Sequence, residues 1–305
     1  MTAPVLVTGA PGNVGTPLVL ELLRLGARVR VAARDVTAAR ATLGDALEVV
    51  PFDFERPDTF GPALAGVEEM FLLRPTQIAD VDGVIVPALR SAKAAGVRHV
   101  VFLSIQGADK NRLVPHRKIE DRLRASGLAW TFVRAAYFMQ NLSTTHAAEI
   151  RELDEIWIPA GRSSRTAHVD ARDVAAIAAR ALVEDGHAGQ AYTPTGPAAL
   201  TYDEIAGLLT RELGRPIRNA DPGPLRYWRR MRRRGMPPAM VAVTLGIYTA
   251  ARLGLADGLT NDVQRITGRP PIPMEQFIHD TRDAWRRADG AAAPAPPDTA
   301  NGGPP

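Results

Sequence analysis

The chain has 305 residues, of which 46% are hydrophobic and 23% charged, with 26 Gly, 25 Pro and no Cys. This composition is that of an ordinary globular protein and excludes collagen, coiled-coil and wholly disordered chains. Without cysteine, disulfides, Cys-ligated zinc, iron–sulfur clusters and thiol catalysis are excluded. No apolar run in the sequence reaches the roughly 20 residues of a membrane span, and the first residues carry no signal-peptide pattern. We therefore expect a cytoplasmic protein of enzyme size that does not enter a membrane.

The charge balance is nearly even, with 37 Lys and Arg against 33 Asp and Glu and a formal net charge of +4. Only three of the cationic residues are lysines, Lys93, Lys110 and Lys118, and the others are arginines. A net charge this small, spread over the whole chain, argues against a nucleic-acid partner.

The first 135 residues alternate short apolar runs with helical patterns. The expected strands are 5–7, 29–33, 47–52, 70–73, 100–103 and 130–133. The expected helices between them are 16–25, 38–43, 59–64, 81–95 and 115–125. Near-continuous apolar strands separated by helices are typical of a parallel sheet that is covered on both faces. The predicted fold is therefore α/β, with a doubly wound parallel sheet.

The pattern changes after residue 135. We expect a helix over 141–153, a strand over 156–158, an Ala-rich helix from Asp173 to about residue 182, and a strand over 190–194. From Thr201 onward the chain is mainly helical, and Thr201 with Glu204 predicts a capping box at the start of a helix.

A glycine-rich segment, Thr8-Gly9-Ala10-Pro11-Gly12-Asn13-Val14-Gly15, joins the first strand to the first helix. Gly9 permits the tight turn, Gly12 lets the backbone approach a pyrophosphate, and Gly15 lets the helix pack closely on the strand. The pyrophosphate would bind at the helix N-terminus, where free N–H groups and the dipole favour an anion. The alternative is a turn that only reverses the chain. The candidate cofactor-binding residues here are Thr8, Gly9, Gly12, Asn13, Val14 and Gly15.

The second strand ends at Arg34-Asp35. An acidic residue at this position suits the ribose hydroxyl of NAD, whereas an arginine suits the 2′-phosphate of NADP, which a guanidinium can bind with two hydrogen bonds. We therefore expect NADP(H) to be favoured over NAD(H), with Arg34 as the phosphate ligand or, alternatively, as an ordinary surface residue.

Further candidate cofactor contacts follow the third and fourth strands. Asp53 and Phe54 would lie beside the adenine, and Leu73 and Arg74 along the path of the ribose and nicotinamide. For these four residues, a purely structural role in the loops is an equally good interpretation.

The densest charge cluster is the arginine run, Arg226-Tyr227-Trp228-Arg229-Arg230-Met231-Arg232-Arg233-Arg234. We favour a helix with Trp228 and Met231 inward and the arginines in solvent, over a nucleic-acid or membrane surface. A third option is that one arginine holds an anionic substrate. The apolar stretch 236–255 predicts buried packing or a contact between copies of the chain, in a homo-oligomer.

Several motifs in a fixed order resemble the NmrA-like branch of the atypical short-chain dehydrogenase/reductase superfamily. Besides the glycine-rich turn, they are residues 101–104 (VFLS), 116–120 (HRKIE), 126–134 (SGLAWTFVR), 138–142 (FMQNL), 170–174 (DARDV) and 267–271 (TGRPP). The resemblance implies a Rossmann-type NAD(P)-binding domain over 1–135, completed by about 168–195. It further implies a smaller, mainly helical substrate-binding part over 136–167 and 196–288. Residues 289–305, rich in Ala, Pro and Gly, are expected to be a disordered tail.

The wider superfamily uses a Tyr-x-x-x-Lys pair and a serine, and none of the five tyrosines here has Lys four residues later. Ser104 matches the superfamily's serine position, at the tip of the fifth strand. His116 is the best remaining proton donor, since an ordinary imidazole titrates near neutral pH. Tyr137 is expected to line the substrate pocket. Each of the three has a structural alternative: Ser104 as a strand cap, His116 as an exposed helix residue and Tyr137 as a packing residue.

The remaining histidines show no metal-ligand spacing and no G-x-S-x-G segment is present, so neither a metal site nor a hydrolase is predicted. Two functions stay open. The first is an NADP(H)-dependent reductase that transfers hydride to a small planar electrophile such as a quinone, an enone or a dye. The second is a non-catalytic NADP-sensing regulator that acts through a protein partner.

Overall fold

The computed structural model describes residues 3–287 of the chain, which divide into two compact units. The first unit contains residues 3–139, 166–199 and 256–273, and the second contains 140–165, 200–255 and 274–287. The predicted tail over 289–305 lies outside the described residues.

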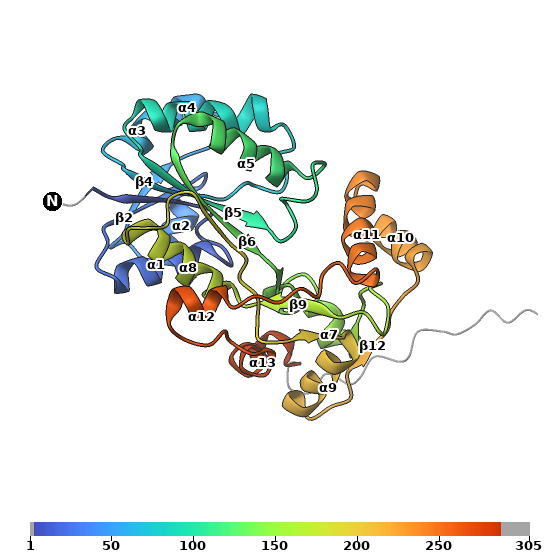
Figure 1. The fold of residues 1–305 in the computed structure, drawn as a ribbon. Helices are drawn as coiled ribbons and strands as arrows, with labels where there is room; N and C mark the ends of the chain where they lie inside the picture. Colours follow the sequence, from blue (N-terminus) through green and yellow to red (C-terminus); the bar gives the residue numbers. More distant parts are fainter. Residues whose placement is uncertain (1–2, 288–305) are drawn as a thin grey trace, which may run out of the picture. The chain divides into compact units, whose positions relative to one another are not determined.

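A seven-stranded parallel sheet forms the centre of the first unit (Figure 1). Its strands are β1 (Val5–Thr8), β2 (Val29–Ala33), β3 (Glu48–Pro51), β4 (Glu69–Leu72), β5 (His99–Ile105), β6 (Ala129–Ala135) and β10 (Gln190–Tyr192). Their order across the sheet is β10-β6-β5-β4-β1-β2-β3, and every adjacent pair is parallel. The chain therefore runs outward from β1 in one direction and then, from β4, in the other. The switch point between β1 and β4 is where doubly wound folds bind their ligands.

Helices cover both faces of this sheet. They are α1 (Gly15–Arg24), α2 (Val36–Leu43), α3 (Phe60–Leu64), α4 (Val86–Ala94), α5 (Pro115–Ser126), α8 (Ala171–Val183) and α12 (Asp262–Thr267). A 3-10 turn, η1 (Pro57–Thr59), precedes α3, and a π-helical turn, η2 (Val81–Ile85), precedes α4. In Figure 1, α1 and α8 lie on one face and α3, α4 and α5 on the other.

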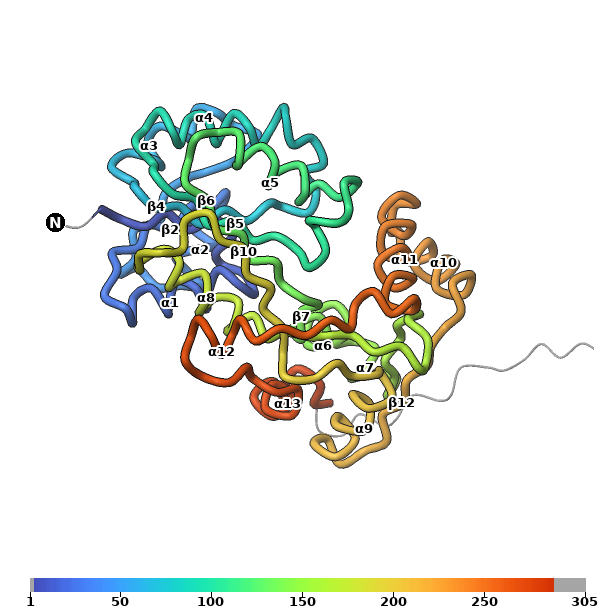
Figure 2. Tube along the Cα trace, in the orientation of Figure 1, coloured from blue at the N-terminus to red at the C-terminus, as the bar shows by residue number. Residues whose placement is uncertain are grey.

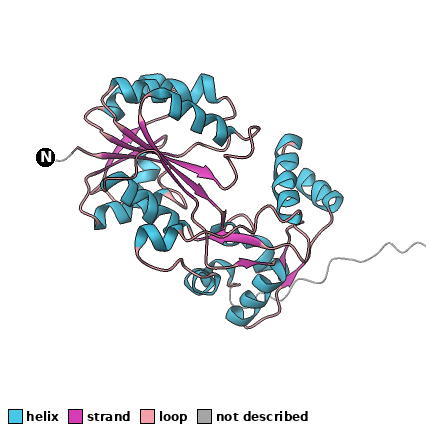
Figure 3. Cartoon of the chain, viewed as in Figure 1, coloured by secondary structure: helices cyan, strands magenta, loops and turns pink. Residues whose placement is uncertain are grey.

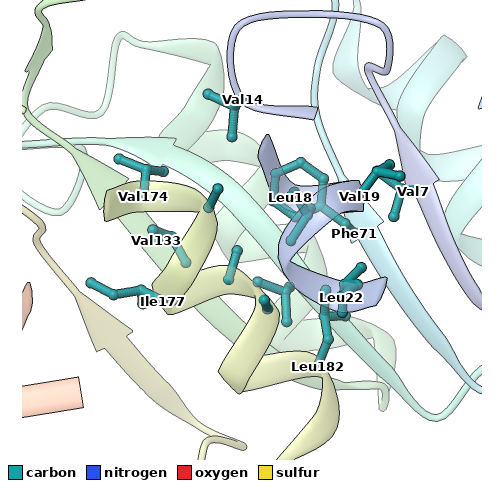
Figure 4. Close-up of a cluster of buried hydrophobic side chains, with 14 of the residues drawn as sticks. Val7, Val14, Leu18, Val19, Leu22, Phe71, Val133, Val174, Ile177 and Leu182 are labelled. Atoms are coloured by element: carbon teal, nitrogen blue, oxygen red, sulfur yellow. The ribbon is translucent and has the colours of Figure 1, made fainter. Parts of the chain in front are cut away.

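The alternation of side chains along the strands separates two hydrophobic cores. Val5 and Val7 of β1 point toward α1 and α8, whereas Leu6 between them belongs to the core under α3, α4 and α5. On α1, Leu18 and Leu22 are fully buried one turn apart, facing α8 (Figure 4). Burial of each such leucine contributes about 1.5–3 kcal/mol. The predicted doubly wound α/β fold is confirmed.

Two further strands extend the first unit beyond the main sheet. These are β7 (Tyr137–Phe138) and β9 (Thr166–Val169), which pair in parallel with Tyr137 opposite His168. The tube in Figure 2 follows the chain from β6 into β7. Neither strand was expected from the sequence, because both pair outside the alternation of strands and helices that predicted the main sheet.

Residues 256–273 belong to the first unit, although the family resemblance implied a place in the substrate-binding part. Long-range polar contacts hold them there. The Asp173 carboxylate accepts a hydrogen bond from the Ile272 N–H at 2.8 Å and pairs with Arg269 at 2.6 Å. Asp262 accepts from the Thr193 N–H at 2.6 Å. Two of the segments that carried the family resemblance, 170–174 and 267–271, are thus in contact.

The second unit is mainly helical (Figure 3). Its elements are α6 (Gln140–Ser143), α7 (Ala147–Leu153), β8 (Glu155–Ile156), α9 (Tyr202–Leu213), β12 (Arg218–Asn219), α10 (Pro224–Arg233), α11 (Pro238–Arg252), α13 (Met274–Thr281) and the 3-10 turn η3 (Arg282–Trp285). A two-residue strand, β11 (Ala199–Leu200), lies at the boundary of the two units. The predicted capping box is present, because the Thr201 hydroxyl accepts from the Glu204 N–H and the Glu204 carboxylate accepts from the Thr201 N–H.

Two details of the second unit differ from expectation. The helix expected over 141–153 is two short helices, α6 and α7. In the arginine run, which forms α10, the inward residues are Tyr227 and Met231, four residues apart, while Trp228 is only half-buried. Sequence spacing did not distinguish an i, i+3 pair from an i, i+4 pair, since both lie on one helix face. Within residues 3–287, no helix is both long and apolar enough to cross a bilayer.

Candidate cofactor and active site

The glycine-rich turn is so tightly folded that its three glycines have no room for a Cβ atom. Gly9 has φ +80, a left-handed conformation, and a Cβ there would lie 2.8 Å from Leu73 Cδ1. A Cβ on Gly12 would lie 2.6 Å from the carbonyl oxygen of Gly9, and one on Gly15 would come closer still. Real Cβ contacts are not this short, so all three positions require glycine. The structure thus explains Gly12 by the turn itself, in addition to any ligand.

The turn delivers the N-terminus of α1 to the carboxyl end of β1, at the switch point of the sheet. No side chain caps this helix and its first turn, all of it within the described residues, holds no acidic residue. The N–H groups that precede the helix and open it, those of Asn13, Val14 and Gly15, therefore meet no competing carboxylate, whereas the N–H groups of Gly12 and Thr16 are bonded to each other's residue. This is the arrangement that binds a phosphate group in dinucleotide-binding folds.

Thr8 and Leu73 join the two strands at the switch point. The buried Thr8 hydroxyl donates to the Phe71 carbonyl at 3.0 Å and accepts from the Leu73 N–H at 2.8 Å. Leu73 in turn covers Gly9. Both residues therefore position the turn, and the Thr8 side chain is occupied within the protein.

The two residues at the end of β2, Arg34 and Asp35, differ in their contacts. Asp35 is the N-cap of α2, and its carboxylate accepts a hydrogen bond from the Ala38 N–H at 2.9 Å. Arg34 is exposed and has no ion-pair partner among the described residues. The acidic residue is thus engaged locally, whereas the cation next to the glycine-rich turn is available for an anion.

Asp53 and Phe54 follow β3, as expected, but they form a compact local turn. An Asp53 carboxylate oxygen accepts from the Glu55 N–H at 3.0 Å. Phe54 is buried in the core with its ring edge-to-face against Phe52, 5.0 Å between centroids. These contacts favour the structural interpretation of Phe54, and a cofactor contact by either residue stays a prediction.

Arg74 organises the loop after β4. Its guanidinium donates to the carbonyl oxygens of Pro75 at 3.0 Å, Thr76 at 3.2 Å and Ile78 at 2.6 Å. Burial lowers the pKa of Arg74, and its Nε is buried without a hydrogen-bond partner in the described part of the chain.

His116 is the second residue of α5 and stacks on Phe102 of β5, with 6.0 Å between ring centroids. Burial, and next the positive charge of nearby Arg74, lower the pKa of His116 from 6.5 to about 4, against a smaller opposing effect of Glu120. The expectation of an imidazole that titrates near neutral pH is therefore wrong, because the ring is largely withdrawn from water. At pH 7 the His116 side chain is neutral.

Ser104 does not face solvent at the tip of β5. It is 1% exposed, and its hydroxyl donates to the Glu120 carboxylate at 2.8 Å. Glu120 is fully buried on α5 and also accepts two hydrogen bonds from Arg134, at 2.9 and 2.7 Å. The Glu120 carboxylate raises the pKa of the Arg134 guanidinium. The network locks α5 against β5 and β6.

Glu120 and Arg134 were not singled out from the sequence. A signal was present, because Ile119 and Leu123 mark the buried stripe of α5 and Glu120 lies directly beside it. A fully buried carboxylate is rare unless it is paired, but the place of Glu120 beside the stripe did not by itself show that it is buried. His116 is one helical turn before Glu120 on the same helix.

Tyr137 is half-buried on β7, with its ring edge-to-face against His168 at 5.5 Å between centroids. His168 is fully buried, and burial lowers its pKa to about 4. The structure thus joins Ser104 and His116 through α5 and places Tyr137 on a separate strand pair. A role of Tyr137 toward substrate stays a prediction.

The sheet order, the glycine-rich turn at the switch point and the uncapped α1 together define a Rossmann-type protein with a dinucleotide-binding turn. Comparison with known proteins specifies the family further. The model of the NmrA-like family matches residues 1–230, and the chain belongs to the NmrA-like family.

Similar proteins include an NAD(P)H azoreductase of Xenophilus azovorans, 32% identical over 277 residues that cover 90% of this chain and 96% of that protein. Another is the (4-alkanoyl-5-oxo-2,5-dihydrofuran-3-yl)methyl phosphate reductase of Streptomyces griseus, 34% identical over 92% of this chain and 99% of that protein. The fold is also that of the Citrobacter triphenylmethane reductase solved with NADP(H), with a TM-score of 0.78, 24% identity, and coverage of 91% of this chain and 99% of that one.

Proposed function

We propose that this protein is an NADPH-dependent reductase that delivers hydride to a small planar electrophile such as a quinone or an enone. The observation that carries the proposal is the glycine-rich turn, whose three glycines admit no Cβ and whose helix N-terminus holds no carboxylate. The residues present fit a dinucleotide, since the turn leaves backbone N–H groups for a diphosphate at the switch point of the sheet. The reductase names of the two similar proteins support the chemistry.

A preference for NADP(H) over NAD(H) follows from the end of β2. The 2′-phosphate requires a cation, and Arg34 is exposed there without an ion-pair partner in the described residues. NAD would require an acidic residue toward the ribose, and the carboxylate of Asp35 is used as the cap of α2.

A bound nicotinamide supplies the hydride in this chemistry. The chain's own residues position the hydride acceptor and hold the N–H proton that is directed at its carbonyl oxygen. A neutral His116 is a hydrogen-bond donor to a carbonyl oxygen on which negative charge develops, and its low pKa excludes an imidazolium at neutral pH. Ser104, Glu120 and Arg134 are positioning residues that fix α5 and thereby the imidazole.

A quinone or an activated enone needs less assistance from a general acid than a simple ketone, because its conjugated carbonyl system is already electron-poor. The absence of Tyr-x-x-x-Lys from this sequence is therefore compatible with reduction of such acceptors. The named substrate of the Streptomyces griseus relative, an alkanoyl-substituted oxo-dihydrofuran, is of this electron-poor kind.

The test is an assay that follows NADPH absorbance with a panel of quinones and enones, alongside NADPH and NADP+ affinities from calorimetry. We expect acceptor-dependent NADPH oxidation, which is slower with the variant His116→Phe at unchanged NADPH affinity. Nucleotide binding without turnover on any acceptor would refute the reductase and favour the NADP-sensing regulator. Absence of nucleotide binding would refute both.

A further inference from the structure

A cavity of about 370 Å³ lies within the second unit and is separate from the residues of the proposed cofactor site. Its wall includes His146 and Glu149 from the start of α7, Trp157 after β8, and Tyr227, Met231 and Arg234 from α10 and its C-terminal end. This volume is at the lower end of the roughly 300–1,000 Å³ found for small-molecule sites. The arginine run singled out in the sequence therefore borders this cavity, which is partly open to solvent.

The charges around the cavity do not cancel. Glu149 is buried, and one of its carboxylate oxygens pairs with both Arg234 and, at 3.6 Å, Arg230. Burial lowers the pKa of His146 to about 4, so this imidazole is neutral at pH 7 and contributes no charge. Glu155 also acts on Arg230, but it is itself paired with Arg218 at 2.5 Å. Three guanidinium groups against two carboxylates leave one net positive charge beside the cavity.

Arg234 is placed to use that charge on a ligand. Its side chain is half-exposed, and within residues 3–287 its guanidinium makes a single hydrogen bond, to Glu149. A guanidinium has five N–H donors in a planar fork, so most of them are left for a ligand. A carboxylate matches this fork with two parallel hydrogen bonds.

The rest of the wall is apolar and aromatic. Trp157 and Tyr227 stack with 5.9 Å between ring centroids, and Arg230 lies over the indole ring at 4.1 Å. Met231, buried on the same face of α10 as Tyr227, adds a polarisable side chain. Such a surface favours a planar hydrocarbon body.

We propose that this cavity binds a small aromatic carboxylate, with its carboxylate on Arg234 and its ring against Trp157, Tyr227 and Met231. A monoanion neutralises the unbalanced charge, whereas a neutral aromatic molecule leaves it unpaired and a cation is repelled by Arg230 and Arg234. Neither the cofactor nor the proposed reductase activity is required for this binding.

Calorimetric titration of the nucleotide-free protein with benzoate tests the proposal, with benzamide as a neutral ligand of the same shape. We expect benzoate to bind, and benzamide to bind at least about tenfold more weakly, because the charge-assisted hydrogen bonds are lost. Equal affinities for the two ligands, or no binding of benzoate, would overturn the proposal without touching the proposed function.

Variants locate the binding. Arg234→Gln is expected to weaken benzoate at least about tenfold, and Arg234→Lys, which keeps the charge but loses the fork, by a smaller factor. Arg233→Gln is the matched control, since Arg233 is an exposed residue of α10 that is not part of the cavity wall. Equal losses in Arg233→Gln and Arg234→Gln would show that benzoate binds elsewhere. The comparison of benzoate with benzamide on the unmodified protein needs no variant to fold.

Discussion

Replacing Arg34 by Gln removes the cation at the carboxyl end of β2 and keeps a side chain of similar reach. Arg34 is exposed, has no ion-pair partner among the described residues and lies beside Asp35, whose carboxylate caps α2. The substitution therefore breaks no internal contact of the described structure, and protein stability is expected to change by less than about 0.5 kcal/mol. Any change in nucleotide affinity then reports on the ligand.

The magnitude follows from the bond that is lost. Hydrogen bonds to charged groups contribute about 1.5–3 kcal/mol, and an exposed site lies at the lower end because water and salt screen the charge. A loss of about 1.5–2 kcal/mol corresponds to a roughly 10- to 30-fold weaker affinity for NADPH. NADH lacks the 2′-phosphate, so its affinity is expected to stay within about twofold.

The assay is calorimetric titration of both nucleotides against the wild type, Arg34→Gln and Arg40→Gln. Arg40 is a matched control, because it is an exposed arginine on the adjacent helix α2. The ratio of NADPH to NADH affinity is expected to fall in Arg34→Gln alone. An unchanged ratio, or the same fall in Arg40→Gln, would refute the assignment of Arg34 to the phosphate.

Three further outcomes are expected. Gly12→Ala places a Cβ 2.6 Å from the Gly9 carbonyl oxygen, so it is expected to destabilise the protein by about 1–3 kcal/mol and to abolish tight nucleotide binding. The control Gly61→Ala, in open space on α3, is expected to be tolerated, and equal urea midpoints for the two variants would contradict this. Glu120→Gln removes the nearer and fully buried of the two carboxylates that pair with Arg134, with Asp109 left at 3.6 Å, at a cost on the order of 3 kcal/mol in chemical denaturation. Asp121→Asn on the exposed face is expected to cost less than about 1 kcal/mol. The free energy of unfolding is also expected to fall as the pH drops from about 6.5 to 4, because imidazoles with a folded pKa of about 4 bind protons mainly after unfolding. The loss at pH 5.5 relative to pH 7 is on the order of 1 kcal/mol per imidazole. Equal urea midpoints at these two pH values would rule out this pH dependence. The imidazoles concerned are those of His116, His146 and His168.

Local signals in the sequence were sufficient for the framework of the first unit. Apolar runs predicted the six strands β1 to β6, and the glycine spacing predicted the turn after β1, because a strand buried on both faces and a left-handed turn depend mainly on their own residues. The capping box at Thr201 is local in the same way. The strands β7 and β9 were not predicted, since they pair with each other outside the alternation of strands and helices that predicted the main sheet.

The states of the candidate site residues were decided by tertiary contacts. Nothing near His116 in the sequence indicates that its pKa lies at about 4, since that value arises from burial and from Arg74, 42 positions earlier. The partners of Ser104 are likewise on α5 and β6, so the serine that the sequence places at a strand tip is in fact a buried donor.

The sequence by itself thus determined which elements form and where a dinucleotide-binding turn is placed. Only the tertiary structure decided that Asp173 draws residues 256–273 into the first unit, that Glu120 is buried with Arg134, and which arginines of the run border a cavity. The physical reason is that hydrogen-bonded turns and amphipathic repeats are properties of neighbouring residues, whereas burial and charge compensation depend on segments that meet only after the chain has folded.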